Sequence, residues 1–191
     1  MVNRRTVVYH LPFTIHHSYM SEFDEEWARA LAEAERRARA SGRGDVTEYI
    51  LLRRTNDFVR QAAADWLYNT FTEHAGRANR SGASIRIERR DAHRFHTGNS
   101  VMVGALLTLS HGVRSLMIEA GWPRSPRDGI VRGGGLASAR IRHFGLRNAD
   151  EELLLVYAED NRPQWLVLER TGARTPLLEE RVSRHVTQLL G

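Results

Sequence analysis

The stretch VMVGALLTLSHGVRSLMIE, residues 101–119, decides the fold. Its apolar residues suit one buried helix as well as two buried strands, because a short apolar run has no diagnostic period. Ser110, His111 and Gly112 interrupt the run, and this turn signal favours strands at 101–107 and 115–119. The sequence therefore predicts paired strands in an α+β fold. The alternative is a single helix over the whole stretch, with the glycines that follow it forming only a loop.

Patterns of both kinds continue on either side of this stretch. Alternating, β-branched or buried apolar residues predict further strands at 6–13, 83–96 and 151–158. A capping pattern with an acidic first turn predicts a helix at 24–40, and apolar residues near helical spacing predict another at 45–74. Two shorter helices are predicted at 136–147, after a run of glycines, and at 163–171, before Gly172. The last segment, 175–191, fits a strand or a helix equally well. The length of 191 residues fits one domain over 1–191 with a sizeable core.

The composition excludes several classes of chemistry. The sequence has no cysteine, so disulfides and thiolate nucleophiles are absent. All 28 of its Lys+Arg residues are arginines, and the net charge of +5 permits attraction to nucleic acid or to acidic cofactors. No apolar run is long enough to span a bilayer and no signal peptide is recognisable, which predicts a cytoplasmic protein without a membrane partner. The histidines have no paired acidic ligand, so no metal site is predicted.

The segment RGGGLASA, residues 132–139, is the most unusual part of the chain. Three consecutive glycines lose much backbone entropy on folding. They are expected either in a loose loop or where the backbone comes unusually close to another group. A strand, a glycine-rich turn and a helix N-terminus together form an arrangement that binds phosphate groups. The order of the predicted elements around these glycines fits that arrangement.

The segment Arg132-Gly133-Gly134-Gly135-Leu136-Ala137 resembles the cofactor loop of the GNAT superfamily of acetyl-CoA-dependent N-acetyltransferases. The resemblance covers about residues 101–174, with Val103-Gly104 like the third strand and 116–119 like the fourth. It also includes EELLLVYAEDN, similar to the fifth strand and its asparagine, and a segment ending at Gly172. It implies a mixed, mostly antiparallel sheet flanked by helices. An enlarged two-helix acceptor segment at 14–82 would lie between the first two strands.

The resemblance implies acetyl-CoA, or another acyl-CoA, as co-substrate and no metal. The residues of the loop would bind the pyrophosphate, and the asparagine after the fifth strand would position pantetheine. The implied cofactor-binding residues are Val131, Arg132, Gly133, Gly134, Gly135, Leu136, Ala137 and Asn161. Residues 101–174 would then form the acyl-CoA-binding core.

The function implied is transfer of an acetyl group to a primary amine by direct attack on the thioester. Glu119 ends an apolar strand, where burial would raise its pKa and make it the catalytic base. The alternative is a strand-end carboxylate paired with an arginine. Leu168 occupies the position where the family commonly has a tyrosine acid, so Tyr157 or water would protonate the thiolate, or the chain has lost activity.

The acceptor is expected to be a small-molecule or peptide amine, and a homodimer is compatible with the resemblance. Two alternatives follow from particular features. The arginine content and high isoelectric point permit a toxin-like acetylation of aminoacyl-tRNA, with salt-dependent RNA binding. The leucine at position 168 permits an acyl-CoA-binding module without catalytic activity.

Overall fold

The computed structural model describes residues 22–42 and 44–191. In chain order its elements are α1 (Glu22–Ala40), α2 (Gly44–Arg80), β1 (Arg86–Thr97), β2 (Ser100–His111), β3 (Arg114–Trp122), β4 (Ala137–His143), β5 (Glu151–Tyr157), β6 (Pro163–Leu168), β7 (Arg174–Pro176) and α3 (Glu179–Leu190). Short 3₁₀ turns lie at Pro126–Asp128 and Arg147–Ala149. The strand expected at 6–13 lies outside the described residues.

The described strands form one sheet in the order β1-β2-β3-β4-β5-β6-β7, and every neighbouring pair is antiparallel. The prediction of an α+β fold is confirmed, but the sheet is antiparallel throughout these strands, not mixed. The stretch 101–119 forms β2 and β3, as the turn signal indicated. Gly112 and Val113 connect them, and Gly112 has φ +57°, which a two-residue hairpin turn requires.

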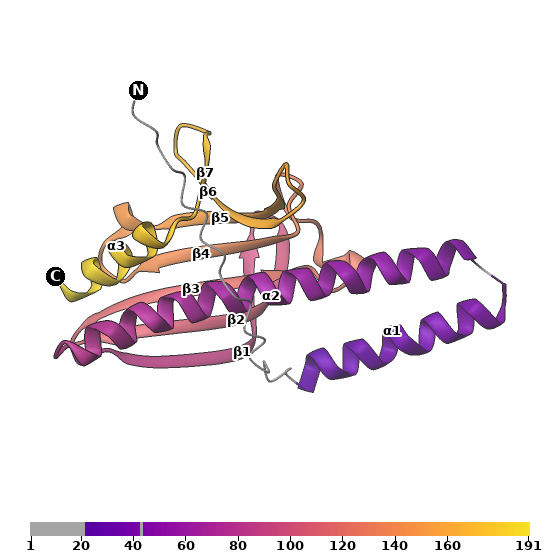
Figure 1. Cartoon of the computed structure of the whole chain (residues 1–191), viewed down its shortest axis with the longest axis horizontal. Helices are drawn as coiled ribbons and strands as arrows, with labels where there is room; N and C mark the ends of the chain where they lie inside the picture. The colour runs from indigo at the N-terminus through magenta and orange to yellow at the C-terminus, as the bar shows by residue number, and fades with distance from the viewer. Residues whose placement is uncertain (1–21, 43) are drawn as a thin grey trace, which may run out of the picture.

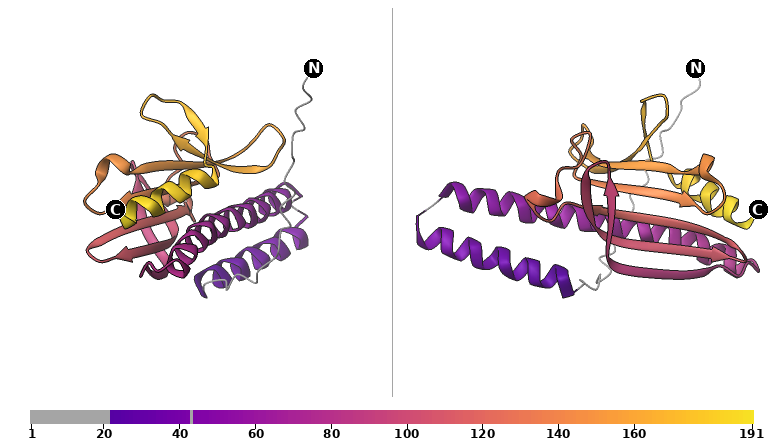
Figure 2. Two further views of the ribbon diagram at one scale, coloured as in Figure 1. Left: turned by 60° about the vertical axis from the view of Figure 1, so that its left-hand side comes forward. Right: turned by 180° about the vertical axis from the view of Figure 1, so that it is seen from behind.

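Two helices cover one face of the sheet (Figure 1). Helix α2 runs across the middle strands, α3 packs beside it, and α1 lies along α2 without reaching the sheet (Figure 2). We call the side that α2 and α3 cover the covered face. The other side, which no helix of the described residues covers, is the open face. The two predicted helices near the N-terminus are thus present, and the undecided C-terminal segment contains helix α3.

The covered face carries the main hydrophobic core. Its strand residues alternate along the chain, as period-two strands require, and they contact buried residues of α2 and α3. The strand positions include Leu107, Leu109, Ile118, Trp122, Ile141, Leu155, Trp165 and Val167, and the helix positions include Leu67, Phe71, Val182 and Leu189. Burial of such side chains stabilises the fold by about 1.5–3 kcal/mol each.

Two segments expected as helices are strands. Residues 137–143 form β4 and residues 163–168 form β6. In β4, Ala139 and Ile141 face the core while Arg140 and Arg142 face the other way, a period of two that is incompatible with a helical face. The alternation in ASARIRH decides the local structure, and tertiary packing against both neighbouring strands satisfies its backbone.

The sheet bends sharply in the region of strands β1, β2 and β3. A bulge shifts the register of β1 between Arg90 and His93, and Ala92 within it has φ +53°. Gly104 and Gly121 pair opposite each other, and a side chain at Gly104 would overlap the neighbouring Ala120 carbonyl. The bend brings the end of β1 and the start of β2 over the open face. There a second, smaller hydrophobic cluster forms from Phe95, Met102, Val131 and Leu154, with Val156 and Leu168 at its margin.

Candidate functional site

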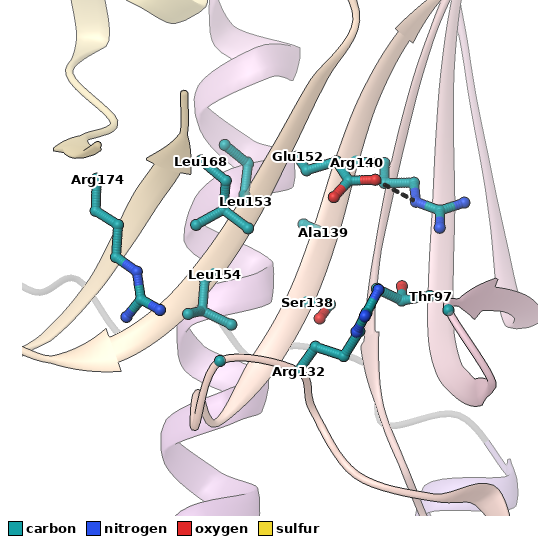
Figure 3. A pocket seen from close by; sticks show the side chains of 12 residues that line it. Thr97, Arg132, Ser138, Ala139, Arg140, Glu152, Leu153, Leu154, Leu168 and Arg174 are labelled. Carbon is teal, nitrogen blue, oxygen red and sulfur yellow. Dashed lines mark ion pairs between the residues drawn. The ribbon is translucent and has the colours of Figure 1, made fainter. Parts of the chain in front are cut away.

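A pocket of about 260 Å³ lies on the open face beside the smaller cluster (Figure 3). The β1–β2 turn, the loop before β4, and strands β4 to β7 all contribute to its wall. We call it the arginine pocket; its lining residues are Thr97, Gly98, Arg132, Gly133, Ser138, Ala139, Arg140, Glu152, Leu153, Leu154, Leu168 and Arg174. Residues from positions 97 to 174 meet here because the end of β1 and the start of β2 lie over strands β4 to β7 of the antiparallel sheet.

The side chains of the three arginines of the pocket, Arg132, Arg140 and Arg174, make no hydrogen bond with any other residue of the described ranges. Arg174 and Arg132 lie on either side of Leu154 (Figure 3). Each packs over a glycine: a Cβ on Gly98 would lie 3.1 Å from Arg132 Cδ, and one on Gly133 would lie 3.1 Å from Arg174 Nη2. The glycines therefore leave room for the arginine side chains, whose guanidinium N–H groups are available for a ligand.

Two buried polar atoms of the pocket also have no hydrogen-bond partner among the described residues. They are Thr97 Oγ1 and Arg140 Nε. Arg140 has only longer ion-pair contacts, with its Nη1 3.9 Å from Glu119 Oε1 and its Nε 3.8 Å from Glu152 Oε1. Because buried polar atoms in proteins are nearly always hydrogen-bonded, these atoms mark a place where a ligand or water is expected.

The glycine triplet has a structural explanation. Gly133 and Gly134 have φ +82° and +76°, which disfavour other residues. A side chain at Gly135 would overlap Leu154 and would lie 2.7 Å from the Leu155 carbonyl oxygen, so this residue packs directly on β5. The close approach that the sequence indicated is therefore an approach to the protein's own strand. The helix expected after the triplet is β4, so no helix N-terminus is available there to bind phosphate.

The predicted cofactor-binding residues separate into several environments. Arg132 and Gly133 line the pocket, whereas the other two glycines of the triplet do not. Val131 belongs to the smaller cluster, and Leu136 and Ala137 contribute to the main core. Asn161 lies in the exposed turn between β5 and β6 with φ +60°. Only part of the predicted set is brought together.

Glu119 is buried on the open face with 1% of its surface exposed. Its carboxylate accepts hydrogen bonds from His93 Nε2 at 2.8 Å and from Arg142 Nη2 at 3.0 Å. Of the two interpretations of this residue, these contacts match the carboxylate paired with an arginine. Both oxygens of the carboxylate are therefore occupied by these partners.

The two residues predicted to be catalytic do not meet. Tyr157 extends from the end of β5 on the covered side, where its hydroxyl lies 3.5 Å from Asn56 Oδ1 of α2. Glu119 lies on the open side of β3, between Ile118 and Ala120, which face the core. Since the sheet separates them, they cannot act on one substrate.

A second group of ionisable residues fixes α3 to the covered face. His143 Nε2 and His185 Nδ1 are 2.9 Å apart, and His185 Nε2 lies 3.2 Å from the Glu151 carboxylate. Burial, followed by the charge of His185, lowers the pKa of His143. Burial also opposes ionisation of Glu151, but hydrogen bonds from His185 and Arg181 outweigh it and lower its pKa. This group holds α3 and does not open to the pocket.

Of the residues that line the pocket, sequence reasoning identified only Arg132 and Gly133, and it missed the polar side chains of Thr97, Arg140, Glu152 and Arg174 among others. Arg140 has a signal in the sequence, because it alternates with apolar residues in ASARIRH. The alternation of arginines in β4 would have placed Arg140 and Arg142 on one face once a strand was assumed. The other three have no local signal, since only the meander brings them together.

Comparison with known proteins finds no matching family model, no matching curated protein and no matching solved structure. None of the described helices is long and apolar enough to cross a membrane. Within residues 22–42 and 44–191, no three histidine, aspartate or glutamate side chains are grouped as metal ligands would be.

Proposed function

We propose that the chain binds a small ligand with a phosphate or similar dianionic group in the arginine pocket, with the acyl-CoA class as the leading candidate. The observation that carries this proposal is the set of three arginines that line one pocket without hydrogen bonds to the described residues. Guanidinium groups match phosphate oxygens in charge and geometry. The side chains of the three arginines and of Glu152 together have a net charge of +2, which balances a phosphate monoester of charge about −2.

The size of the pocket limits which part of a ligand it holds. A volume of about 260 Å³ corresponds to roughly nine water molecules at about 30 Å³ each. This is enough for a phosphate group and a short carbon chain, but not for a whole coenzyme A. Leu154 and Leu168 would contact the carbon chain next to the phosphate. The rest of an acyl-CoA would lie along the open face.

The resemblance to the GNAT superfamily supports an acyl-CoA as the ligand, with one change of mechanism. A GNAT-type loop would bind pyrophosphate through the amides of a helix N-terminus, whereas strand β4 follows this loop. Arginine side chains would therefore do most of the binding. With Glu119 ion-paired and Tyr157 on the other side of the sheet, a binding module without catalysis is the form of this function that we favour.

Acyl transfer is the second candidate function, and one observation favours it. The Glu152 side chain lies in the pocket wall, is 59% exposed, and has its nearest ion-pair contact 3.8 Å away at Arg140. It would accept the proton of an attacking amine in place of Glu119. Release of free thiol from acetyl-CoA in the presence of amines, lost in Glu152→Gln, would support transfer.

Calorimetric titration of CoA and acetyl-CoA into the purified protein tests the proposal. We expect binding to the wild type and a loss of about tenfold or more in Arg174→Gln, because a charge-assisted hydrogen bond contributes about 1.5–3 kcal/mol. Arg162→Gln is the matched control, since Arg162 is exposed in the β5–β6 turn, outside the pocket, and its side chain pairs with Asp160. Equal affinity of Arg174→Gln and wild type, or no binding to the wild type, would contradict the proposal.

A further inference from the structure

Glu119 is the centre of a charged network that spans four strands of the open face. His93 of β1, Arg142 of β4 and the more distant Arg140 of β4 all face its carboxylate. The network ends at Glu152 of β5, which pairs with Arg140. It therefore connects a buried carboxylate to the wall of the arginine pocket through one shared side chain, Arg140.

The contact between His93 and Glu119 depends on the bend in the sheet. Strand β2 lies between the strands that carry these residues, and the residue of β2 paired with His93 is Gly104. The imidazole extends across β2 and donates from Nε2 to Glu119 at 2.8 Å. The ring stacks on Phe95, at a centroid distance of 5.9 Å, which fixes its orientation.

Arg140 is shared between the network and the pocket. Its contacts with Glu119 and Glu152 are 3.9 and 3.8 Å long, and its buried Nε has no hydrogen bond among the described residues. A ligand anion in the pocket would compete with Glu119 for this guanidinium. The strength with which Glu119 attracts Arg140 therefore affects the affinity of the pocket for an anion.

We propose that His93 and Glu119 make anion binding in the arginine pocket depend on pH, with tighter binding when His93 is protonated. This inference rests on the proposed function. Protonated His93 places a full positive charge beside the Glu119 carboxylate, which weakens the attraction between Glu119 and Arg140. The guanidinium of Arg140 then bonds to the ligand. When His93 is neutral, Arg142 and Arg140 alone balance the buried carboxylate.

Each ring nitrogen of His93 has a charged neighbour. Nε2 already donates to Glu119, so the added proton binds Nδ1. Arg90 Nη2 lies 3.4 Å from Nδ1 and opposes the proton, but Arg90 is exposed and can turn into water. Among the described residues, the other charged members of this network are Glu119, Arg140, Arg142 and Glu152. Histidine is the side chain whose charge ordinarily changes between about pH 5 and 8.

Sulfate is the probe for the test, because it remains a dianion from about pH 5 to 8. A change in the charge of the ligand therefore does not contribute to the pH dependence of binding. The affinity for sulfate is measured calorimetrically at fixed ionic strength near pH 5.5 and near pH 8. We expect the affinity of the wild type for sulfate to be about threefold to tenfold higher at the lower pH. This is the effect expected of one added positive charge at the distance of His93 from the pocket, in a partly solvated site. His93→Gln, which keeps a donor for Glu119 but does not titrate, is expected to show no such rise.

Two more variants complete the test. His96→Gln is the matched control, because His96 is an exposed histidine of the same strand outside the network, and it should retain the wild-type pH dependence. Glu119→Gln removes the competing carboxylate and is expected to bind sulfate at both pH values at least as tightly as the wild type does at the lower one. A thermal melt of each variant confirms folding before titration.

The outcomes separate the two proposals. Sulfate binding that is independent of pH in the wild type, or an unchanged pH dependence in His93→Gln, overturns this inference and leaves the proposed function standing. Failure of the wild type to bind sulfate, CoA and acetyl-CoA at either pH overturns both. A pH dependence lost in His93→Gln and kept in His96→Gln supports the inference.

Discussion

The covered and open faces of the sheet use the same strands for different purposes. Along β4, Ala139 and Ile141 face the core, while Arg140 and Arg142 face the open side. Along β3, Ile118 and Ala120 face the core in the same way, while Glu119 between them faces the open side. The residues of the covered face exclude water and stabilise the fold. The open face carries, beside the smaller hydrophobic cluster, charged side chains of which some make no hydrogen bond and are suited to a ligand, which indicates that alternation along β3 and β4 separates folding from binding.

The largest expected effect comes from two adjacent leucines of β5 that lie on opposite faces. Leu155 belongs to the main core and Leu154 to the smaller cluster, and both are almost fully buried. We expect Leu155→Ala to reduce the free energy of unfolding by about 2–5 kcal/mol. Leu154→Ala should cost less, because its cavity would open to the arginine pocket. Urea unfolding measures both, and equal losses would mean that the two faces contribute alike.

A smaller effect is expected in the glycine triplet. Gly135→Ala places a methyl group against Leu154 and the β5 backbone, and overpacking of this kind costs about 1–3 kcal/mol. A methyl group at position 134 would lie more than 4 Å from any other atom of the described residues, so Gly134→Ala is the matched control. The cost expected for this variant is only the backbone strain of a side chain at positive φ. Thermal unfolding of the two variants should rank Gly135→Ala as the less stable. The reverse order would mean that close packing on β5 is not what excludes side chains here.

The smallest expected effect is a pH dependence on the covered face. Because the pKa of His143 is lowered in the folded protein, the unfolded chain binds more protons as the pH falls below the ordinary histidine value of about 6.5. Stability should therefore fall from about pH 7.5 to about pH 5.5. Glu151, whose pKa is lowered, contributes stability above the ordinary carboxyl range and loses it only at lower pH.

Replacement of one imidazole isolates this pH effect. His143→Gln retains polar groups next to His185 but does not titrate, so its urea-unfolding free energy should change less over the same pH interval. His96→Gln, at an exposed position of β1, should follow the wild type. If all three proteins lose stability in parallel, the buried histidine pair is not responsible.

The local elements of the fold were largely predictable where the pattern was local. The turn at Ser110, His111 and Gly112 correctly indicated two strands, and a capping pattern and helical spacing indicated the two N-terminal helices. The segment that forms β4 was assigned to a helix because the glycine turn suggested a helix start, and the segment that forms β6 because Gly172 suggested a helix end. Neither strand is stable without its neighbours, so local preference could not decide between the two conformations.

The candidate site was predictable only in part. Arg132 and Gly133 were found through the unusual glycine run, and they do line the pocket. The assignment of Glu119 as a catalytic base depended on its position at a strand end. Its partners His93 and Arg142 come from strands β1 and β4, on either side of the β2–β3 hairpin, and a sequence gives no distance between such strands.

The sequence by itself indicated the two N-terminal helices, the β2–β3 hairpin and the absence of cysteine chemistry, because each follows from neighbouring residues or from composition. Only the tertiary structure decided that the sheet is antiparallel throughout its described strands. It also decided that Glu119 is ion-paired and that Arg132, Arg140 and Arg174 share a pocket. The physical reason is that charges act through space: their partners are set by the register of the strands and the bend at Gly104.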